Sequence, residues 1–131
     1  MISFDIEDKP GTWYDLGSGA RIQLRNTTRE DFKELRKQTT TKMSEIKRID
    51  GVLERVAWEE KDEDLHEELF WDKVIVDWEG IVDAKGLLMP CTRENKVKLM
   101  LRSAKFAKMV NDSFKILTDA EAAELETAEK N

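Results

Sequence analysis

The sequence predicts an α+β fold, with an N-terminal β-hairpin packed against three to five helices in the C-terminal two-thirds of the chain. Two observations indicate this class. Alternating apolar and polar residues flank Gly17-Ser18-Gly19, and apolar residues at helical spacing recur from Leu65 onward. A chain of 131 residues that is 40% hydrophobic is long enough for one packed core. We expect a single domain over residues 1–117 and an exposed acidic helix or tail over 118–131.

The first hairpin is expected between residues 12 and 25. Trp13 and Leu16 precede the glycines, and Ile22 and Leu24 alternate with polar residues after them. Glycine supplies the positive φ that a tight turn requires. One face of this hairpin should therefore be buried.

The next segment begins with a helix signal. Thr27 or Thr28, with an acidic residue three positions later, resembles a capping box and predicts a helix over about 28–38. Phe32 and Leu35 should face inward. Farther on, Asp50-Gly51 is a strong signal for a two-residue turn, so we expect a second hairpin across residues 42–60, with a helix as the alternative.

A second helix should begin at the acidic run Asp62-Glu63-Asp64, because carboxylates suit the positive end of the helix dipole. Four apolar residues at i, i+3, i+4 and i+7 then predict a continuous helical stripe. These residues are Trp71, Val74, Ile75 and Trp78.

The loop that follows is bracketed by Gly80 and Gly86, with Asp83 between them, and Pro90 leads into a helix capped by Thr92. We expect that helix to break near Ser103. Thr118-Asp119-Ala120-Glu121 resembles another capping box, which predicts that a separate last helix starts there.

Composition limits the classes of partner. The chain carries 22 basic and 28 acidic residues, for a net charge of −6. Such a protein repels phosphate backbones, so a nucleic-acid partner is not expected, although a local basic face could still exist. No apolar run approaches the roughly 18 residues of a membrane-spanning helix, and no signal peptide is visible at Met1 to Asp5. One cysteine fits the reducing cytosol.

No combination of residues predicts catalysis, a cofactor or a metal. His66 is the single histidine and Cys91 the single thiol, so neither has the partners of a zinc site or a catalytic triad. The acidic residues around His66 lack the ligand spacing of an EF-hand. We expect a protein that is not an enzyme.

The tryptophans give the best hints of a binding surface. Trp71 and Trp78 fit the helical stripe and are expected in the core. Trp13 with its neighbour Tyr14, and Trp58, are less easily buried. Tryptophan and tyrosine are enriched at interfaces, so these three are the candidate protein-binding residues.

The segment 71–100 resembles phage and prophage tail assembly chaperone-like proteins. The resemblance is carried by Asp77-Trp78, Gly80-Ile81, Asp83, Gly86, Pro90-Cys91-Thr92 and Glu94-Asn95-Lys96. The opening hairpin, from Gly11-Thr12-Trp13-Tyr14 to Arg25, also looks like the start of such proteins. In this pattern Trp71, Trp78, Gly80, Asp83, Gly86, Pro90 and Thr92 have an architectural explanation, as a helix, an ordered loop and a capped helix.

The resemblance implies a function in phage tail assembly, in the cytosol of a host bacterium. Proteins of this kind are thought to hold the tape-measure protein in soluble form while tail-tube subunits assemble around it. Tape-measure and tail-tube proteins are therefore the implied partners, and a homo-oligomer is left open. The alternative is a structural tail-completion or connector component of the virion.

Overall fold

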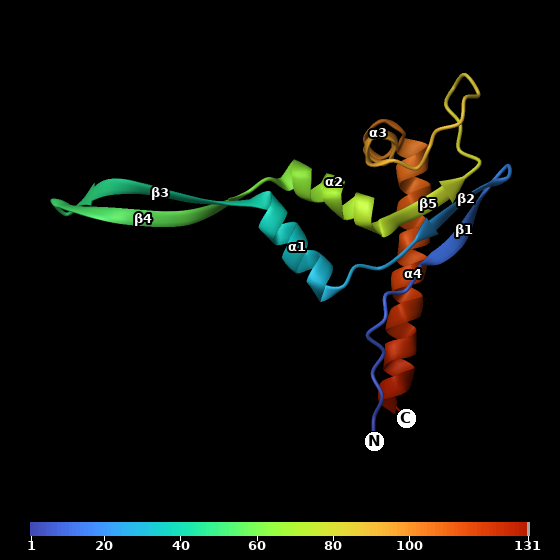
Figure 1. Ribbon diagram of the computed structural model, residues 1–131, viewed down its shortest axis with the longest axis horizontal. Coiled ribbons are helices and arrows are strands. Elements are labelled where there is room, and N and C mark those ends of the chain that lie inside the picture. The colour runs from blue at the N-terminus through green and yellow to red at the C-terminus, as the bar shows by residue number, and fades with distance from the viewer. Residues whose placement is uncertain (131) are drawn as a thin grey trace. The chain divides into compact units, whose positions relative to one another are not determined.

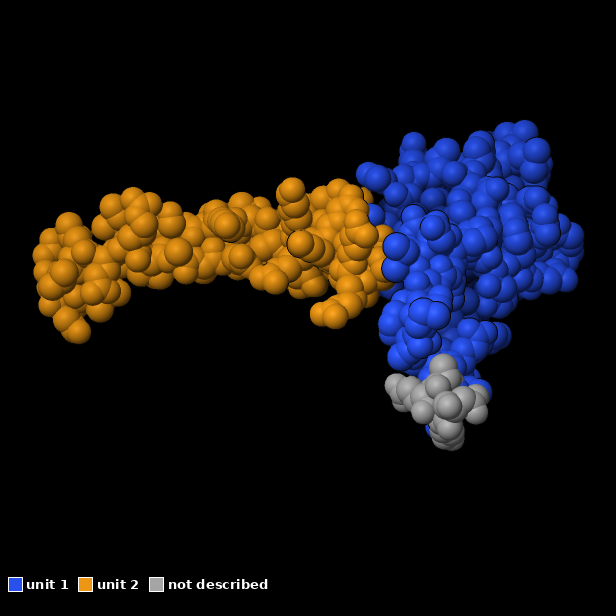
Figure 2. All heavy atoms as spheres, turned by 60° about the horizontal axis from the view of Figure 1, so that its bottom comes forward, with its two compact units in different colours: residues 1–27, 71–131 blue, residues 28–70 orange. Residues whose placement is uncertain are grey.

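The computed structural model describes residues 1–130 and has the predicted α+β class (Figure 1). It divides into two compact units, residues 28–70 and residues 1–27 with 71–131 (Figure 2). The folding of residues 1–117 as one domain stays a prediction. No helix in the described part of the chain is both long enough and apolar enough to span a membrane.

The discontinuous unit contains a three-stranded antiparallel sheet in the order β1-β2-β5. Its strands are β1 (Thr12–Gly17), β2 (Ala20–Leu24) and β5 (Ile75–Glu79). The predicted first hairpin is confirmed, and Gly17, Ser18 and Gly19 all have positive φ. Ile22 and Leu24 are fully buried, so one face of the hairpin is covered as expected.

The prediction of one continuous helical stripe from Trp71 to Trp78 is wrong about the secondary structure, although all four of its apolar residues are buried. Helix α2 (Glu63–Val74) ends before Ile75, and Trp78 lies in β5. The strand contains a bulge, because Ile75 pairs with Leu24 while Asp77 pairs with the adjacent Gln23. An extra residue in one strand reverses its alternation. Residues three apart in β5 can therefore both face the core, which gives a strand the spacing of a helix.

Two further helices complete this unit, α3 (Arg93–Arg102) and α4 (Ala104–Lys130). The predicted break at Ser103 is confirmed. Ser103 closes α3 with its N–H on the Leu99 carbonyl, and its Oγ accepts from the N–H of Phe106 at 3.1 Å. The predicted start of a separate helix at Thr118 is wrong, because α4 runs through it; residue 131 lies outside the described residues.

The core of this unit forms where α4 meets the sheet and the end of α2. Trp78 packs edge-on against Phe106, with ring centroids 5.8 Å apart, and Trp71 packs the same way against Phe114. Edge-to-face aromatic pairs of this kind add to the free energy of simple burial. The core positions of both tryptophans are thus confirmed. The buried apolar residues here are Ile22, Leu24, Trp71, Val74, Ile75, Trp78, Phe106, Val110 and Leu117.

The unit of residues 28–70 begins with α1 (Arg29–Thr39). Thr28 and Asp31 form the predicted capping box, with Thr28 Oγ1 accepting from the Asp31 N–H at 3.2 Å. Leu35 is buried as expected. Phe32 is not, since 49% of it is exposed, and its ring stacks on Phe70 with centroids 6.4 Å apart.

The second hairpin is confirmed, and the alternative of a helix is wrong. Strands β3 (Thr40–Ile49) and β4 (Val52–Lys61) pair along their whole length. Asp50 and Gly51 both have positive φ, as a type I′ turn requires. Helix α2 then starts where expected, because Asp62 Oδ1 accepts from the N–H of Leu65 at 3.1 Å.

Candidate protein-binding arm

The arm, defined here as residues 40–61, is a two-stranded antiparallel ribbon formed by β3, β4 and their turn. Within the described residues its strands pair only with each other. All of its residues are exposed except Thr40 and Val56, which are half-buried. Both faces of the ribbon are therefore open to solvent, and each strand has one unpaired edge.

The strand register sorts the arm's side chains onto two faces, because directly opposed residues of an antiparallel pair share a face. One face, called here the apolar face, carries the pairs Met43–Trp58 and Ile49–Val52 and the residue Val56. Charged side chains lie among them on the same face: Glu45, Lys47, Glu54 and Glu60. The other, called here the basic face, carries Lys42, Arg48, Arg55 and Lys61 against a single acid, Glu59. It also carries the exposed apolar residues Ile46 and Leu53. The chain as a whole is acidic, so this ribbon presents a local basic face on an acidic protein.

An isolated hairpin with this composition is unusual. Two-stranded hairpins without further packing are marginally stable in water, and long open edges invite pairing with other chains. Large apolar side chains remain exposed along the arm: Met43, Ile46, Ile49, Val52, Leu53 and Trp58. Four of them, Met43, Ile49, Val52 and Trp58, lie on the apolar face, and Ile46 and Leu53 lie on the basic face. Exposed apolar side chains in such number favour an interaction site.

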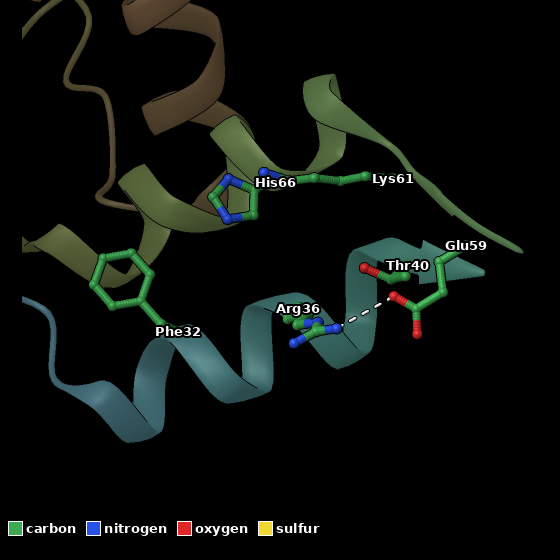
Figure 3. A pocket seen from close by; sticks show the side chains of 6 residues that line it. All are labelled: Phe32, Arg36, Thr40, Glu59, Lys61 and His66. Atoms are coloured by element: carbon green, nitrogen blue, oxygen red, sulfur yellow. Dashed lines mark hydrogen bonds and ion pairs between the residues drawn. The ribbon is translucent and has the colours of Figure 1, made fainter. Parts of the chain in front are cut away.

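A hollow of about 420 Å³ lies at the base of the arm (Figure 3). Arg36 Nη2 donates to Glu59 Oε2 at 3.3 Å across it, which ties α1 to the start of the ribbon. The lining mixes one aromatic ring with charged and polar groups, and it contains no thiol. It is formed by Phe32, Arg36, Thr40, Glu59, Lys61 and His66.

The three candidate contact residues lie in different settings. Trp58 is on the apolar face of the arm, 37% exposed, with its Nε1 donating to Glu60 Oε1 at 3.3 Å. Trp13 is half-buried in the sheet, with the guanidinium of Arg21 4.1 Å from its ring centroid. A cation over the ring covers part of the surface that a partner would use.

Tyr14 is also half-buried, and it pairs with the fully buried Ile22. Burial raises the pKa of its phenol, a hydrogen bond with Thr12 lowers it, and the charge of Glu121 raises it further. Because Tyr14 lies directly opposite Ile22, it shares the buried face of the hairpin. The binding roles of Trp13, Tyr14 and Trp58 stay predictions, and Trp58 has the most accessible setting of the three.

The loop between β5 and α3 is ordered by its own hydrogen bonds. Trp78 Nε1 donates to the Met89 carbonyl at 2.7 Å, so the buried ring anchors the far end of the loop. Asp83 Oδ1 accepts from the N–H groups of Lys85 and Leu87, at 2.8 and 3.0 Å, as an Asx turn does. Gly86, inside this turn, has positive φ.

The two ends of the same loop are fixed by different groups. Gly80 has positive φ, and a Cβ there would lie 2.7 Å from the Gly19 carbonyl oxygen. At the other end, Thr92 Oγ1 accepts from the Asn95 N–H, and the Pro90 carbonyl accepts from Asn95 Nδ2 at 2.9 Å. These contacts give the glycines, Asp83, Pro90 and Thr92 a structural role in ordering the loop.

Two residues were considered for chemistry, His66 and Cys91. His66 lines the hollow at the base of the arm. Cys91 is half-buried, and burial raises the pKa of its thiol; the charge of Lys96 opposes this, and the charges of Asp77 and Asp72 add to it. A raised pKa disfavours the nucleophilic thiolate. Among the described residues no group of three or more His, Cys, Asp or Glu side chains could hold a metal ion.

Sequence reasoning located the arm but missed most of its candidate binding surface. The Asp50-Gly51 turn located it, and Trp58 was singled out, but the other apolar-face residues were not. The apolar residues before the turn, Met43, Ile46 and Ile49, are three apart, so they fall on both faces of a strand and their spacing alone does not define one face. Pairing Met43 with Trp58 and Ile49 with Val52 from the turn outward would have gathered the apolar face.

Comparison with curated proteins and with solved structures gave no match. A family model described as "YdaY prophage protein" matches residues 26–131, which include the arm, the ordered loop and the described part of α4. The match covers well over half of the chain. The chain therefore belongs to the YdaY prophage protein family.

Proposed function

We propose that this prophage protein is a tail assembly chaperone that binds a tape-measure or tail-tube protein through its β3–β4 arm. The observation that carries the proposal is the exposed ribbon itself. Its apolar face is exposed to solvent, and no other part of its own unit covers that face. The prophage family and the resemblance of residues 71–100 to tail assembly chaperones support the assignment to tail assembly.

In the proposed mechanism, the chain binds an apolar partner transiently and shields its apolar surface from water. A tape-measure protein is long, helical and rich in apolar residues, and it needs shielding until the tube closes around it. Met43 and Trp58 lie directly opposite each other, so together they can form one anchor for the apolar residues of a partner helix. The acidic charge of the whole chain keeps the complex soluble. This role requires neither catalysis nor a cofactor, and we place it in the host cytosol.

The test is capture of purified partners by the full chain. A tape-measure fragment or a tail-tube subunit should bind the parent protein, and Met43→Ser with Trp58→Ser should weaken binding about tenfold or more, since truncated anchors each cost upward of about 1 kcal/mol. The control is Leu125→Ser, which removes an exposed apolar side chain of α4, outside the arm. Circular dichroism verifies that all variants are folded. Equal binding by the arm variant and the control would refute the arm as the docking element.

The structural alternative, a tail-completion or connector component, is separated by a second measurement. Mass spectrometry of purified particles should detect no stoichiometric copy of a chaperone. A fixed copy number in finished particles would instead make this chain a virion component.

A further inference from the structure

The outer edge of β3 is an open strand edge. Within the described residues β3 pairs only with β4, so no strand lies along its other side. In an antiparallel pair every second residue directs its N–H and C=O away from the partner strand. Open edges of this kind pair readily with another chain unless their side chains oppose it. The side chains of β3 therefore decide which strand this edge fits.

The sequence of β3 is complementary to itself about Ile46. Two antiparallel copies of one strand can be related by a twofold axis perpendicular to the sheet. Such an axis keeps every side chain on its own face, so it passes midway between one residue and the same residue of the second copy. With the axis at Ile46, positions equally far before and after this residue lie opposite each other.

On the apolar face, this arrangement matches apolar with apolar and acid with base. Met43 of one copy lies opposite Ile49 of the other, and Glu45 lies opposite Lys47. Each match occurs twice because of the axis. Within one chain Lys47 Nζ is already 2.8 Å from Glu45 Oε1, so pairing brings two such ion pairs together with opposite charges adjacent. Both kinds of opposed pair stabilise neighbouring strands.

The basic face fits in the same register. Ile46 lies opposite its own equivalent, Arg48 lies opposite Ser44, and Lys42 faces Asp50 in the turn of the other copy. Lysines along an open edge usually prevent pairing. Here each lysine of β3 meets a carboxylate, so its charge favours pairing with this particular strand.

Neighbouring registers lack these matches. An axis at Glu45 places this residue opposite itself and Lys42 opposite Arg48. An axis at Lys47 places two lysines opposite each other, and an axis at Ser44 places Met43 opposite Glu45. Like charges directly opposed destabilise a strand pair. The side chains therefore select the axis at Ile46.

The outer edge of β4 has no comparable register. An axis at Arg55 places two arginines opposite each other, and an axis at Val56 places Glu54 opposite Trp58. An axis at Ala57 places Glu54 opposite Glu60. Self-complementarity is thus a property of β3 and not of any strand with this composition.

We propose that two copies of this chain pair through the β3 edges of their arms, with Ile46 on the twofold axis. The two ribbons then form one four-stranded antiparallel sheet in a closed dimer. Pairing occupies the β3 edges and leaves both faces of the sheet open, with the two apolar faces on the same side. This self-association goes beyond the proposed chaperone role and is tested on the chain alone, so failure to bind a tail protein leaves it unaffected.

The first experiment is sedimentation equilibrium of the full chain over a wide range of protein concentration. We expect a monomer–dimer equilibrium. Glu45→Lys and Lys47→Glu should each raise the dissociation constant about tenfold or more, because each places like charges opposite each other twice. An equal mixture of these two variants should dimerise nearly as well as the parent, since both opposed pairs then have opposite charges. Circular dichroism checks that each variant is folded.

The matched control for the charge reversals is Glu60→Lys. Glu60 lies on the same face of the arm but on β4, away from the β3 edge. Its substitution changes the net charge as much as Glu45→Lys does, and it should leave the dissociation constant of the dimer unchanged.

The second experiment locates the axis. Two chains, both with Cys91→Ser, are mixed under mild oxidation, one with Met43→Cys and the other with Ile49→Cys. These positions lie opposite each other in the proposed register, so a disulfide-linked dimer is expected. Each chain alone is the control, because its two equivalent thiols would lie about 20 Å apart at roughly 3.4 Å per residue along the strand.

Three results would overturn the proposal. A chain that is monomeric at every concentration forms no such dimer. A dimer that both charge reversals leave unchanged, or that their mixture does not restore, uses another surface or register. Disulfide formation by Met43→Cys alone, as readily as in the mixture, shows that Ile46 does not lie on the axis.

Discussion

Lys96 Nζ donates to both the backbone carbonyl and the Oδ1 atom of Asp72, at 3.1 and 3.2 Å, across 24 positions of sequence. Lys96 is only 8% exposed, and Arg93 Nε reaches the other carboxylate oxygen at 3.0 Å. A buried ammonium is tolerated only when it is paired and hydrogen-bonded. Asp72 therefore fixes the first turn of α3 to the end of α2.

Substitution of Lys96 should destabilise the fold. Lys96→Ala leaves the Asp72 carbonyl without this donor and is expected to lower the free energy of unfolding by about 1–3 kcal/mol. Lys98→Ala on the same helix is the control. Its ammonium is 3.8 Å from Glu94 in an exposed pair, so it should change stability by about 0.5 kcal/mol or less. Urea unfolding followed by circular dichroism measures both, and equal losses would contradict the role given to Lys96.

The indole of Trp78 should control the order of the loop that follows β5. Trp78→Phe keeps an aromatic ring against Phe106 but removes the donor to the Met89 carbonyl. We expect a loss of about 1 kcal/mol and faster hydrogen exchange at the Asp83 and Met89 amides, whose bonds close the loop. Trp58→Phe, in the exposed arm, should leave those exchange rates unchanged. Unaltered exchange in Trp78→Phe would show that the loop does not depend on this bond.

The two loop glycines should respond differently to alanine. Both have positive φ, which costs a non-glycine residue about 1–2 kcal/mol. At Gly80 the added Cβ would also lie 2.7 Å from the Gly19 carbonyl oxygen, whereas at Gly86 it meets nothing within 4 Å. Gly80→Ala should therefore be the more destabilising change. Thermal unfolding ranks the two, and a larger loss at Gly86 would contradict the contact with Gly19.

Local signals predicted local structure well in this chain. The Thr28–Asp31 capping box, the glycine turn at 17–19 and the Asp50-Gly51 turn each act within a few residues, and each is present as expected. A capping pattern without a helix start, at Thr118, gave a wrong boundary. The four residues from Thr118 to Glu121 do not themselves indicate that α4 continues into them from the preceding turn.

Nonlocal structure explains the remaining errors. The bulge at β5 lets Ile75 and Trp78 face one core from a strand, so their spacing imitates a helix until the pairing with β2 is known. The arm is the converse case. Its turn could be predicted from Asp50-Gly51, but the composition of its two faces depends on which residues oppose each other across the ribbon.

The two threonines in capping patterns should separate a real helix start from an apparent one. Thr92 Oγ1 accepts from the Asn95 N–H at the first turn of α3, so Thr92→Ala should cost about 1 kcal/mol. Thr118 lies inside α4, where its hydroxyl donates to the Lys115 carbonyl at 3.1 Å, so Thr118→Ala should be nearly neutral or slightly stabilising. Chemical unfolding compares them, and a comparable loss at Thr118 would indicate that a helix does start there.

The ion pair between β2 and β5 should make the free energy of unfolding depend on pH in the acidic range. Arg21 donates from Nε and Nη2 to the two carboxylate oxygens of Glu79, at 2.7 and 3.0 Å. This hydrogen bonding lowers the pKa of Glu79 from its ordinary value of 4.5, against a smaller opposing effect of desolvation. A carboxyl whose pKa is lower in the folded state contributes stability above its unfolded pKa, and that contribution is lost as the pH falls through the folded pKa.

Glu79→Gln should therefore be less stable than the parent at neutral pH, and the difference should shrink toward zero in acid. Urea unfolding of both proteins across this range measures it. The same substitution in an Arg21→Gln background is the control, because the guanidinium that lowers the pKa is then absent and most of the pH-dependent part should disappear. If that part persists without Arg21, the bond between these two side chains is not its source.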